Sequence, residues 1–412
     1  MAGLLTKRAV LLAKVQTAEG SAATPVPELN GILIADLNRT PNSETIERNF
    51  LRDSLSNLPY RTGRKLLEAT FSFELRPAPE LGARPEWSPL MRAAGMSETV
   101  TGAATTSLRT AALMWTASAA GGSGVFYVQL AATGDPSVTA VQSVREGGVA
   151  GDDLRRATAI ASMREGEFMY GDFDTLGFST VYVKLSDSTD PDSKAVDYIQ
   201  AVRTVTDIIY YFRDTGHEFV TVGTYRDGML INAVDGLIDI TGMTFNAGGT
   251  VQCQARLVAD YTTPTDVALP TTLYQTHLPD IAQNMAFTFD AFSTGVVPNF
   301  SINFANQLTE RRDVNSPNGF KGMRYTGRNP TGQVTIEQEL VAAFPAYTRW
   351  ENGTEMTWSA VLGSVPKRIT FSSPSVQITS IAETDINGIA GWNLGLRFNS
   401  PATAKELRIK LD

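Results

Sequence analysis

The chain has 412 residues, of which 42% are hydrophobic and 19% charged, and this ordinary globular composition excludes wholesale disorder. Its 35 basic and 43 acidic residues give a net charge of −8, which argues against tight binding to a phosphate backbone, because such binding needs a basic footprint. A single cysteine excludes an internal disulfide, and no segment approaches the roughly 18 consecutive apolar residues of a membrane span.

The first 40 residues show little repeating pattern and contain several turn-forming residues. Their apolar run from Ala9 to Ala13 is interrupted by Lys14, so it is shorter than the roughly 7–15 residues that a signal peptide requires. We expect residues 1–40 to form an N-terminal arm or a first strand, because a segment with so little pattern of its own often lies on another surface. In an assembly, that surface belongs to a neighbouring subunit.

A long strand is predicted over residues 66–76, LLEATFSFELR. Apolar and polar side chains alternate along it, and a period of two is typical of a strand with one face in a core and the other in water. The side chains on the predicted wet face are Glu68, Thr70, Ser72 and Glu74.

Helical signals are sparse. Ser88-Pro89 is typical of a helix start and Gly95 of a helix end, which predicts a short helix over residues 89–94. A second short helix is predicted around residues 342–350. Between them, apolar residues alternate with polar ones around Cys253, after a Gly-Gly turn, which predicts a hairpin with a buried thiol.

The last part of the chain, residues 286–412, alternates strand-like runs with turns. In the run GQVTIEQELV, the polar residues Thr335, Glu337 and Glu339 share one face. Before it, residues 259–285 are rich in Thr and Pro without a period, so we expect a long loop of the kind that often has a function. The predicted class is mostly β, an antiparallel β sandwich or barrel with one or two short helices.

An insertion is predicted over residues 111–204, because two segments that begin at Leu113 and Phe168 resemble each other. Each has an aromatic strand, a turn, a Y-V-x-L strand and an Asp-Pro turn, which indicates a small β module with a two-copy repeat. The predicted organisation is therefore an arm at 1–40, a discontinuous β domain at 41–110 and 205–412, and the inserted module at 111–204.

Candidate catalytic and metal-binding residues are few. His217 and His277 are the two histidines, and neither has metal-ligand spacing to another His or to the cysteine. The densest acidic group, Asp187, Asp190 and their neighbours, shares with the other copy of the repeat only the Asp before Pro, which favours turn chemistry over a calcium site. We therefore predict no catalytic residue, no metal and no cofactor, and we expect that the chain is not an enzyme.

Several short segments point to one family by their order and spacing. They are Thr40-Pro41, Glu47-Arg48-Asn49-Phe50-Leu51, the strand at 66–76, Trp87-Ser88-Pro89-Leu90, Ala93-Ala94-Gly95-Met96, Asn306-Gln307, Arg312-Asp313-Val314, Gly319, Tyr325-Thr326-Gly327-Arg328 and Pro330-Thr331-Gly332. With these segments, the sequence resembles the tail tube (major tail) proteins of long-tailed, siphovirus-like bacteriophages. The resemblance is absent over residues 111–204.

The resemblance implies a structural virion protein. It implies six-fold rings of identical copies, a homohexamer, in which each copy lends strands to one inner barrel, and stacking of these rings into a tube that delivers the genome from capsid to host. The implied partners are other copies of the chain and tail proteins such as the tape measure, tail terminator and distal tail proteins. Genomic DNA would pass through the lumen without specific binding, no membrane would be involved, and assembly would take place in the host cytoplasm.

The wet strand faces fit such a channel. We expect Glu68, Thr70, Ser72, Glu74, Thr335, Glu337 and Glu339 to face the lumen of a negatively lined conduit, and the inserted module to decorate the outside.

The alternative is a carbohydrate-binding or adhesion β-sandwich protein of the tail tip or cell surface. In that case Trp115, Tyr127, Tyr170 and Tyr182 would stack on sugar rings, although aromatic residues that alternate along strands more often belong to a core.

Overall fold

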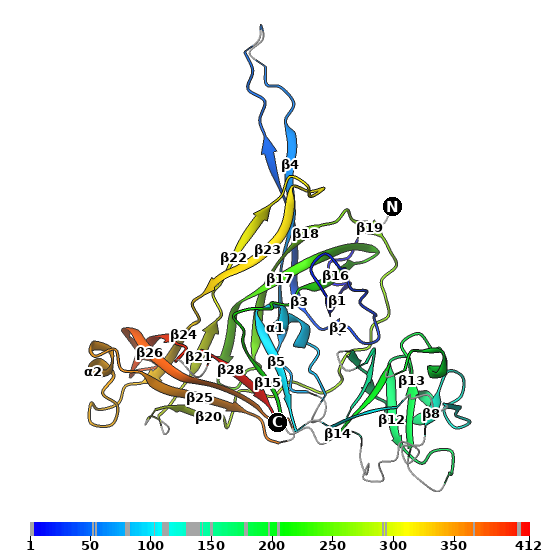
Figure 1. Cartoon of the computed structure of the whole chain (residues 1–412). Coiled ribbons are helices and arrows are strands. Elements are labelled where there is room, and N and C mark those ends of the chain that lie inside the picture. The colour runs from blue at the N-terminus through cyan, green and yellow to red at the C-terminus, as the bar shows by residue number, and fades with distance from the viewer. Residues whose placement is uncertain are drawn as a thin grey trace.

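Figure 1 shows the computed structural model of the chain. It describes residues 4–51, 53, 56–78, 83–102, 104–108, 115–128, 141, 143–148, 151–176, 180–196, 198–203, 207–290, 292, 295–365, 367–401 and 405–412. These residues are mostly strands, with two short α-helices, α1 (Ser88–Ala93) and α2 (Ala346–Glu351). The predicted β class with short helices near 89–94 and 342–350 is therefore confirmed.

Eight antiparallel strands form the central array of the molecule. Their spatial order is β3-β4-β18-β17-β21-β24-β27-β26. The strands are β3 (Ala35–Ile46), β4 (Arg61–Glu74), β17 (Met229–Asn246), β18 (Gln252–Tyr261), β21 (Asn299–Asn303), β24 (Thr331–Glu337), β26 (Ile369–Ile386) and β27 (Ile389–Phe398). The predicted hairpin around Cys253 is β17–β18, and the thiol is buried as expected.

The remaining strands of the same network pair with the first halves of β17 and β26 or with one another. They are β1 (Ala9–Val15), β2 (Gly31–Ile32), β5 (Met96–Thr101), β15 (Asp207–Phe212), β16 (Val220–Arg226), β19 (Thr265–Asp266), β20 (Ala286–Phe289), β25 (Met356–Leu362) and β28 (Arg408–Leu411). β1 pairs with β16 along its whole length, and Leu11 and Ala13 are buried, so this part of the N-terminal segment is a strand of the sheet rather than a detached arm.

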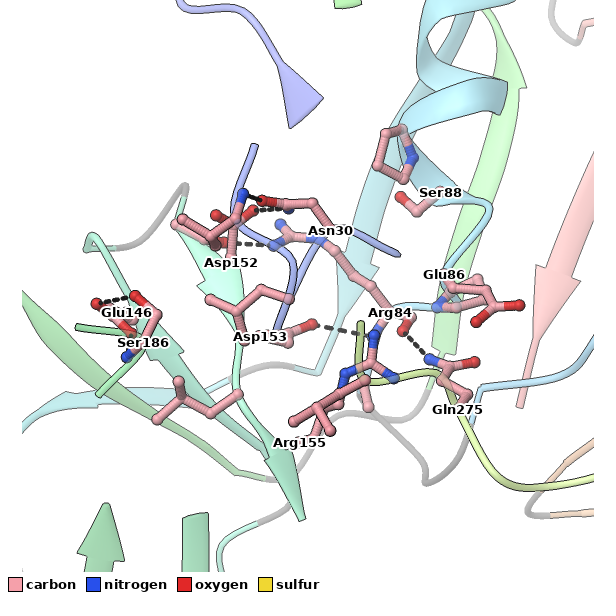
Figure 2. A pocket seen from close by; sticks show the side chains of 18 of the residues that line it. Asn30, Arg84, Glu86, Ser88, Glu146, Asp152, Asp153, Arg155, Ser186 and Gln275 are labelled. Carbon is pink, nitrogen blue, oxygen red and sulfur yellow. Dashed lines mark hydrogen bonds between the residues drawn. The ribbon is translucent and has the colours of Figure 1, made fainter. Parts of the chain in front are cut away.

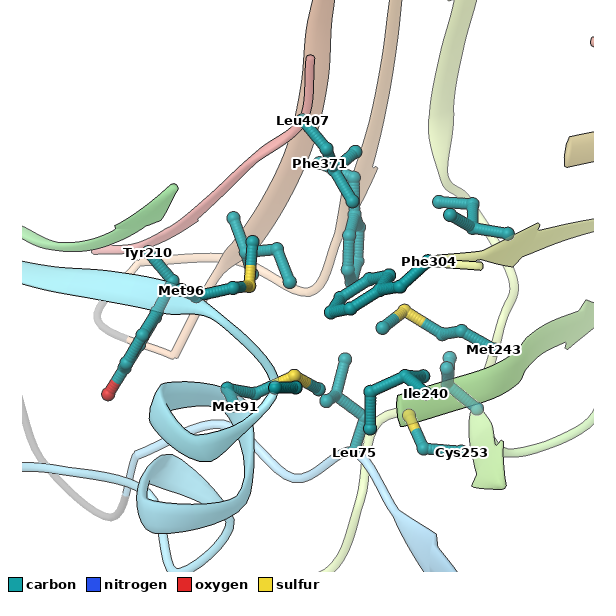
Figure 3. Packing of buried hydrophobic residues seen from close by; sticks show 14 of the residues in the cluster. Leu75, Met91, Met96, Tyr210, Ile240, Met243, Cys253, Phe304, Phe371 and Leu407 are labelled. Carbon is teal, nitrogen blue, oxygen red and sulfur yellow. The ribbon is translucent and has the colours of Figure 1, made fainter. Parts of the chain in front are cut away.

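One apolar core joins the first and second halves of the chain. Figure 3 shows Met91 and Met96 from the first half gathered in it with Phe304 and Phe371 from the second half. Alternation explains why the array can close this core, because strands such as β4 turn apolar side chains, among them Phe71 and Phe73, to one side and mostly polar ones to the other. The two halves therefore fold as one unit.

Part of the inserted segment, together with β6 from just before it, forms two sheets with apolar clusters of their own. The first contains β6 (Ala104–Ser107), β9 (Ser143–Glu146), β10 (Asp152–Asp153) and β14 (Ile199–Arg203). The second contains β7 (Thr116–Ala117), β8 (Phe126–Val128), β11 (Arg155–Arg156), β12 (Glu167–Gly171) and β13 (Thr180–Lys184). Tyr127 and Tyr182, equivalent in the predicted repeat, pair across β8 and β13. Residues 129–140 of the first copy lie outside the described residues.

Candidate functional site: assembly surfaces of the chain

The side of the eight-stranded array that faces away from the core is polar, and we call it the polar face. Along β4, Thr70 is exposed and Glu68, Ser72 and Glu74 are half-buried, while the intervening residues are buried. The same alternation continues across the other strands. The polar face is formed by Asn38, Thr40, Glu68, Thr70, Ser72, Glu74, Gln252, Gln254, Arg256, Thr244, Asn246, Asn299, Ser301, Asn303, Thr331, Gln333, Thr335, Glu337, Asn393, Arg397, Gln377, Ser380 and Ala382.

Arginines neutralise part of the acidic charge on this face. The Glu68 carboxylate lies 3.1 Å from the Arg256 guanidinium on β18, and that of Glu74 lies 3.5 Å from the guanidinium of Arg76. Glu74 also accepts a hydrogen bond of 3.3 Å from the side-chain amide of Gln252. Most other side chains on the face are uncharged amides and hydroxyls. The surface is therefore polar and only weakly charged, less acidic than the glutamates alone suggest.

The second predicted strand, β24, is shorter than the sequence pattern indicated. Thr335 lies on the polar face and donates a hydrogen bond of 3.0 Å to Asn299 on β21. β24 ends at Glu337, so Glu339 and the 81% exposed Leu340 lie beyond the strand. The amide of Gln338 still bonds to the Ala390 carbonyl of β27, and a turn follows at residues 341–343.

Both outer strands of the array have an edge without a pairing partner in the part of the chain that the structure describes. β3 pairs with β4 on one side, and the last third of β26 pairs with β27 on one side. Residues Ala35 and Ala382 on these edges are exposed. An open edge presents unpaired N–H and C=O groups, which is a template for pairing with another chain.

The β3–β4 hairpin extends beyond the array as a projecting arm, residues 43–60 (Figure 1). The described residues of the arm are mostly exposed, and apolar side chains are among them: Ile46, Phe50, Leu51 and Tyr60 are 50%, 67%, 105% and 61% exposed. Exposed apolar side chains gathered on one projection are typical of a surface that another molecule covers.

A second long hairpin is already docked. It consists of β22 (Asn306–Arg312) and β23 (Phe320–Arg328) and continues from β21 and into β24. Its residues Phe320 and Met323 are buried in one cluster with Leu66 and Val258 of the array. At its base, Tyr325 donates a hydrogen bond of 2.9 Å to the Ile238 carbonyl. This hairpin thus covers one end of the polar side of β4, β17 and β18.

Comparison with known protein families matches residues 6–390 to the family described as phage tail tube protein. The chain belongs to the phage tail tube protein family. A search of curated proteins found no match. Membership in this family makes the chain a structural component of a phage tail, and it fits a chain whose prominent surfaces are open edges, a projecting arm and a polar sheet face.

The histidines of this tail tube protein have structural surroundings. The ring of His217 packs on the ring of Tyr325, with centroids 4.6 Å apart, and His277 Nε2 lies 2.6 Å from the Pro77 carbonyl oxygen. Burial lowers the pKa of both. The described residues contain no group of three or more His, Cys, Asp or Glu side chains that could hold a metal ion. Among the same residues, no helix has the length and apolar character needed to cross a membrane.

The acidic group of the module is held by turn contacts. Asp187 pairs with Lys194 and accepts a hydrogen bond from the Thr189 amide. Partial burial alone would raise the pKa of Asp187, but these hydrogen bonds and the Lys194 ammonium hold it at about 2. Asp190 accepts from the Asp192 amide at the start of a 3₁₀ turn, as expected of Asp before Pro.

Two of the four aromatic residues considered for sugar stacking, Trp115 and Tyr182, are buried. Tyr182 is fully buried and Trp115 is 6% exposed. The ring of Tyr182 packs against that of Tyr127, with centroids 5.5 Å apart. Trp115 and Tyr182 therefore belong to the module's interior, whereas Tyr127 and Tyr170 are half-buried.

A cleft of about 1160 Å³ separates the module from the large sheet network and its core, which we call the tube domain (Figure 2). Arg84 connects the two sides: its guanidinium bonds Glu98 of β5 at 2.8 Å and the Gly151 carbonyl at 2.9 Å, while its backbone amide bonds Asp153 of β10. Lys14 of β1 pairs with Asp152 at 2.6 Å. The module is thus fixed to the side of the tube domain that carries β1, with the core between it and the polar face.

Proposed function

We propose that copies of this chain assemble edge to edge into closed rings, and that the rings stack into the tail tube, the conduit for the genome from capsid to host. The observation that supports this best is the polar face, because eight strands in register turn amides and hydroxyls to one side and a shared core to the other. Closing the array across copies would also remove its open edges.

In the proposed ring the polar face lines the channel, with Glu68, Thr70, Ser72, Glu74, Thr335 and Glu337 among the lining residues and Glu339 at its border. A surface rich in neutral amides and hydroxyls, with Arg256 paired to Glu68, offers DNA few phosphate-binding groups, of which the exposed Arg397 is one. The remaining acidic charge repels phosphates within a Debye length of roughly 8–10 Å. DNA would slide through such a channel without specific binding.

The first test is assembly. The purified protein should form rings and tubes with a central channel when it is imaged by negative-stain electron microscopy. Compact single particles under all solution conditions would contradict the proposal and would favour the adhesion alternative. In the virion, the expected partners are the tape measure, tail terminator and distal tail proteins, with assembly in the host cytoplasm.

A change of charge on the polar face tests the channel itself. Replacing the exposed residues Thr70, Gln254 and Gln333 with lysine should slow DNA release from particles without preventing tube assembly, since each lysine adds a phosphate contact. These positions are preferable to Glu68, whose reversal would also break its pair with Arg256. Release is measured by the fluorescence of a DNA-binding dye. Lysine at the exposed Val196 of the module is the matched control, and equal release from both variants would contradict the lumen assignment.

Excision of the module tests its proposed place outside the tube. Thr101 at the end of β5 and Asp207 at the start of β15 are register partners, so an Asn-Gly turn can join the two strands as a hairpin. Because the module contacts the side of the domain opposite the polar face, the shortened chain should still form tubes, with a smaller outer diameter in electron micrographs. A shortened chain that is folded but does not polymerise would instead give the module a role in stacking.

A further inference from the structure

The tube domain contains the same six-stranded unit twice. The first unit has the spatial order β1-β16-β17-β18-β4-β3, and the second has the order β20-β25-β26-β27-β24-β21. All these pairings are antiparallel. If the six strands of each unit are numbered by their order along the chain, the spatial order in both units is first, fourth, fifth, sixth, third, second. In both units a six-residue helix lies between the third and the fourth strand in the sequence. We call these units the first and second repeats.

Local geometry supports the equivalence. The fifth strands, β17 and β26, each have 18 residues, and the sixth, β18 and β27, each have ten. The pairing of fifth with sixth strand shifts register at Thr241 in the first repeat and at Thr379 in the second. Bulges are specific local features, so their recurrence at one place argues for a true repeat.

The shift in register aligns the two repeats residue by residue. In the first repeat, a row of partners runs across four strands through Ala35, Ser72, Gln254 and Gly242. In the second repeat, the corresponding row runs through Ser301, Gln333, Gly395 and Ser380. Ala35 on β3 is therefore the equivalent of Ser301 on β21. By the distance from the bulge, Ala382 on β26 is the equivalent of Thr244 on β17.

The two repeats are joined head to tail within the chain. The fifth strand of the first repeat, β17, pairs antiparallel with the second strand of the second repeat, β21, and Thr244 is the partner of Ser301. The two open edges of the array are the equivalents of these paired strands. β3 of the first repeat is the equivalent of β21, and the end of β26 in the second repeat is the equivalent of the end of β17. Each copy thus carries both halves of a junction that it already makes once internally.

We propose that β26 of one copy pairs with β3 of the next in the same register as β17 with β21, so that a ring closes with three copies and contains six repeats. The partner at each open edge is a second copy of this chain, and Ala382 of one copy lies opposite Ala35 of the next. This inference rests on the proposed tube function and replaces the expected ring of six copies.

The width of the channel selects three copies. With strands about 4.8 Å apart and tilted by roughly 40°, a closed barrel of about 24 strands is about 50 Å across between backbones and leaves a channel of about 35–40 Å between side chains. Two copies, with about 16 strands, would give about 30 Å between backbones, which leaves little more than the width of the DNA itself. Six copies would give about 95 Å, far more than a duplex needs.

Engineered disulfides test the junction and the copy number together. In tubes of the Ala35→Cys, Ala382→Cys double variant, oxidation should link neighbouring copies, because partners on adjacent strands lie within the roughly 7 Å between Cα atoms that a disulfide spans. Both alanines are exposed, and the native Cys253 is fully buried and does not interfere. On a non-reducing denaturing gel, the ladder of products should end at a covalent trimer. A mixture of the two single variants should give no product above a dimer.

A matched control pairs Ala35→Cys with Ala390→Cys. Ala390 is exposed and lies one strand inside the edge, on β27, where no disulfide to the next copy can form. Intact tubes of the first double variant that remain uncrosslinked would overturn the edge pairing, and a ladder that ends at a covalent hexamer would overturn the copy number. Three module protrusions around each ring in averaged end-on images would support three copies independently. Failure of the unmodified protein to form rings would overturn the proposed function itself.

Discussion

Replacing Phe50 and Leu51 with aspartate is expected to abolish tube assembly while leaving the monomer folded. Both residues lie on the projecting arm, 67% and 105% exposed, so neither contributes to the core. Covering such side chains in an assembly contributes about 1.5–3 kcal/mol each, and the loss of both should weaken each contact by at least roughly a hundredfold. Sedimentation velocity and negative-stain microscopy measure assembly, and the thermal midpoint of the monomer measures its fold.

The second repeat supplies the structural precedent for this prediction. Its equivalent hairpin, β22–β23, is docked on the first repeat, where Phe320 and Met323 are buried. The arm is the equivalent of this element in the first repeat, and its exposed apolar residues have no docking surface within the described residues of their own chain. Aspartate at Val196, an exposed apolar residue of the module, is the control and should leave assembly intact. Normal tubes from the Phe50 and Leu51 variant would show that the arm does not hold copies together.

Replacing Arg84 with methionine is expected to destabilise the monomer by about 3–5 kcal/mol, because it leaves the carboxylate of Glu98 buried without its closest partner. Glu98 is also bonded by the Ser88 hydroxyl at 2.9 Å and the Tyr210 hydroxyl at 3.0 Å. Urea denaturation at pH 7 measures the loss. It is best done in the assembly-deficient arm variant, since assembly would add to the apparent stability.

The same pair predicts how stability changes with pH. Burial alone would raise the pKa of Glu98, but the charges of Arg84 and Arg92 outweigh it and lower the pKa from 4.5 to about 2. A carboxylate whose pKa is lower in the folded state stabilises the fold above its unfolded pKa, and this contribution is lost as the pH falls. We expect a loss on the order of 3 kcal/mol between about pH 5 and pH 2.

Two variants control this prediction. Glu98→Gln should flatten the dependence on pH in that window, because the titrating group is gone. Asp187→Asn, which breaks a surface pair with the partly buried Lys194, should change the free energy of unfolding by less than about 1 kcal/mol at pH 7. If Arg84→Met cost no more than Asp187→Asn, the pair would not be a main support of the fold.

The amino-acid sequence predicted what depends on alternation within one segment. Present in the structure are the strand at 66–76, the hairpin around Cys253 and both short helices. Each leaves a local pattern in the sequence, either the burial of one face or, for the helix at 89–94, a proline at its start and a glycine after its end. The polar residues of β4 lie on the polar face for the same reason. Their electrostatic partners left no such pattern: Arg256 lies 188 positions after Glu68.

Long-range features were missed for a related reason. The two repeats share strand order, the lengths of their fifth and sixth strands and a bulge, but equivalent positions differ in residue type, as Phe71 and Gly332 do. The module's repeat was visible because its aromatic residues recur at Tyr127 and Tyr182. The end of β24 at Glu337 left no local signal in the sequence, because the alternation of apolar and polar residues continued to Leu340.

The module interrupts one repeat and not the other, between β5 and β15. Because the two repeats are separate segments of one chain, their sequences can differ from each other, whereas identical subunits have the same sequence at every position of a ring. On the proposed arrangement, each module therefore has a bare second repeat on either side, and the tube's exterior carries ribs separated by grooves. Added bulk, such as a fused reporter domain, has room at the module without crowding its neighbours around the circumference.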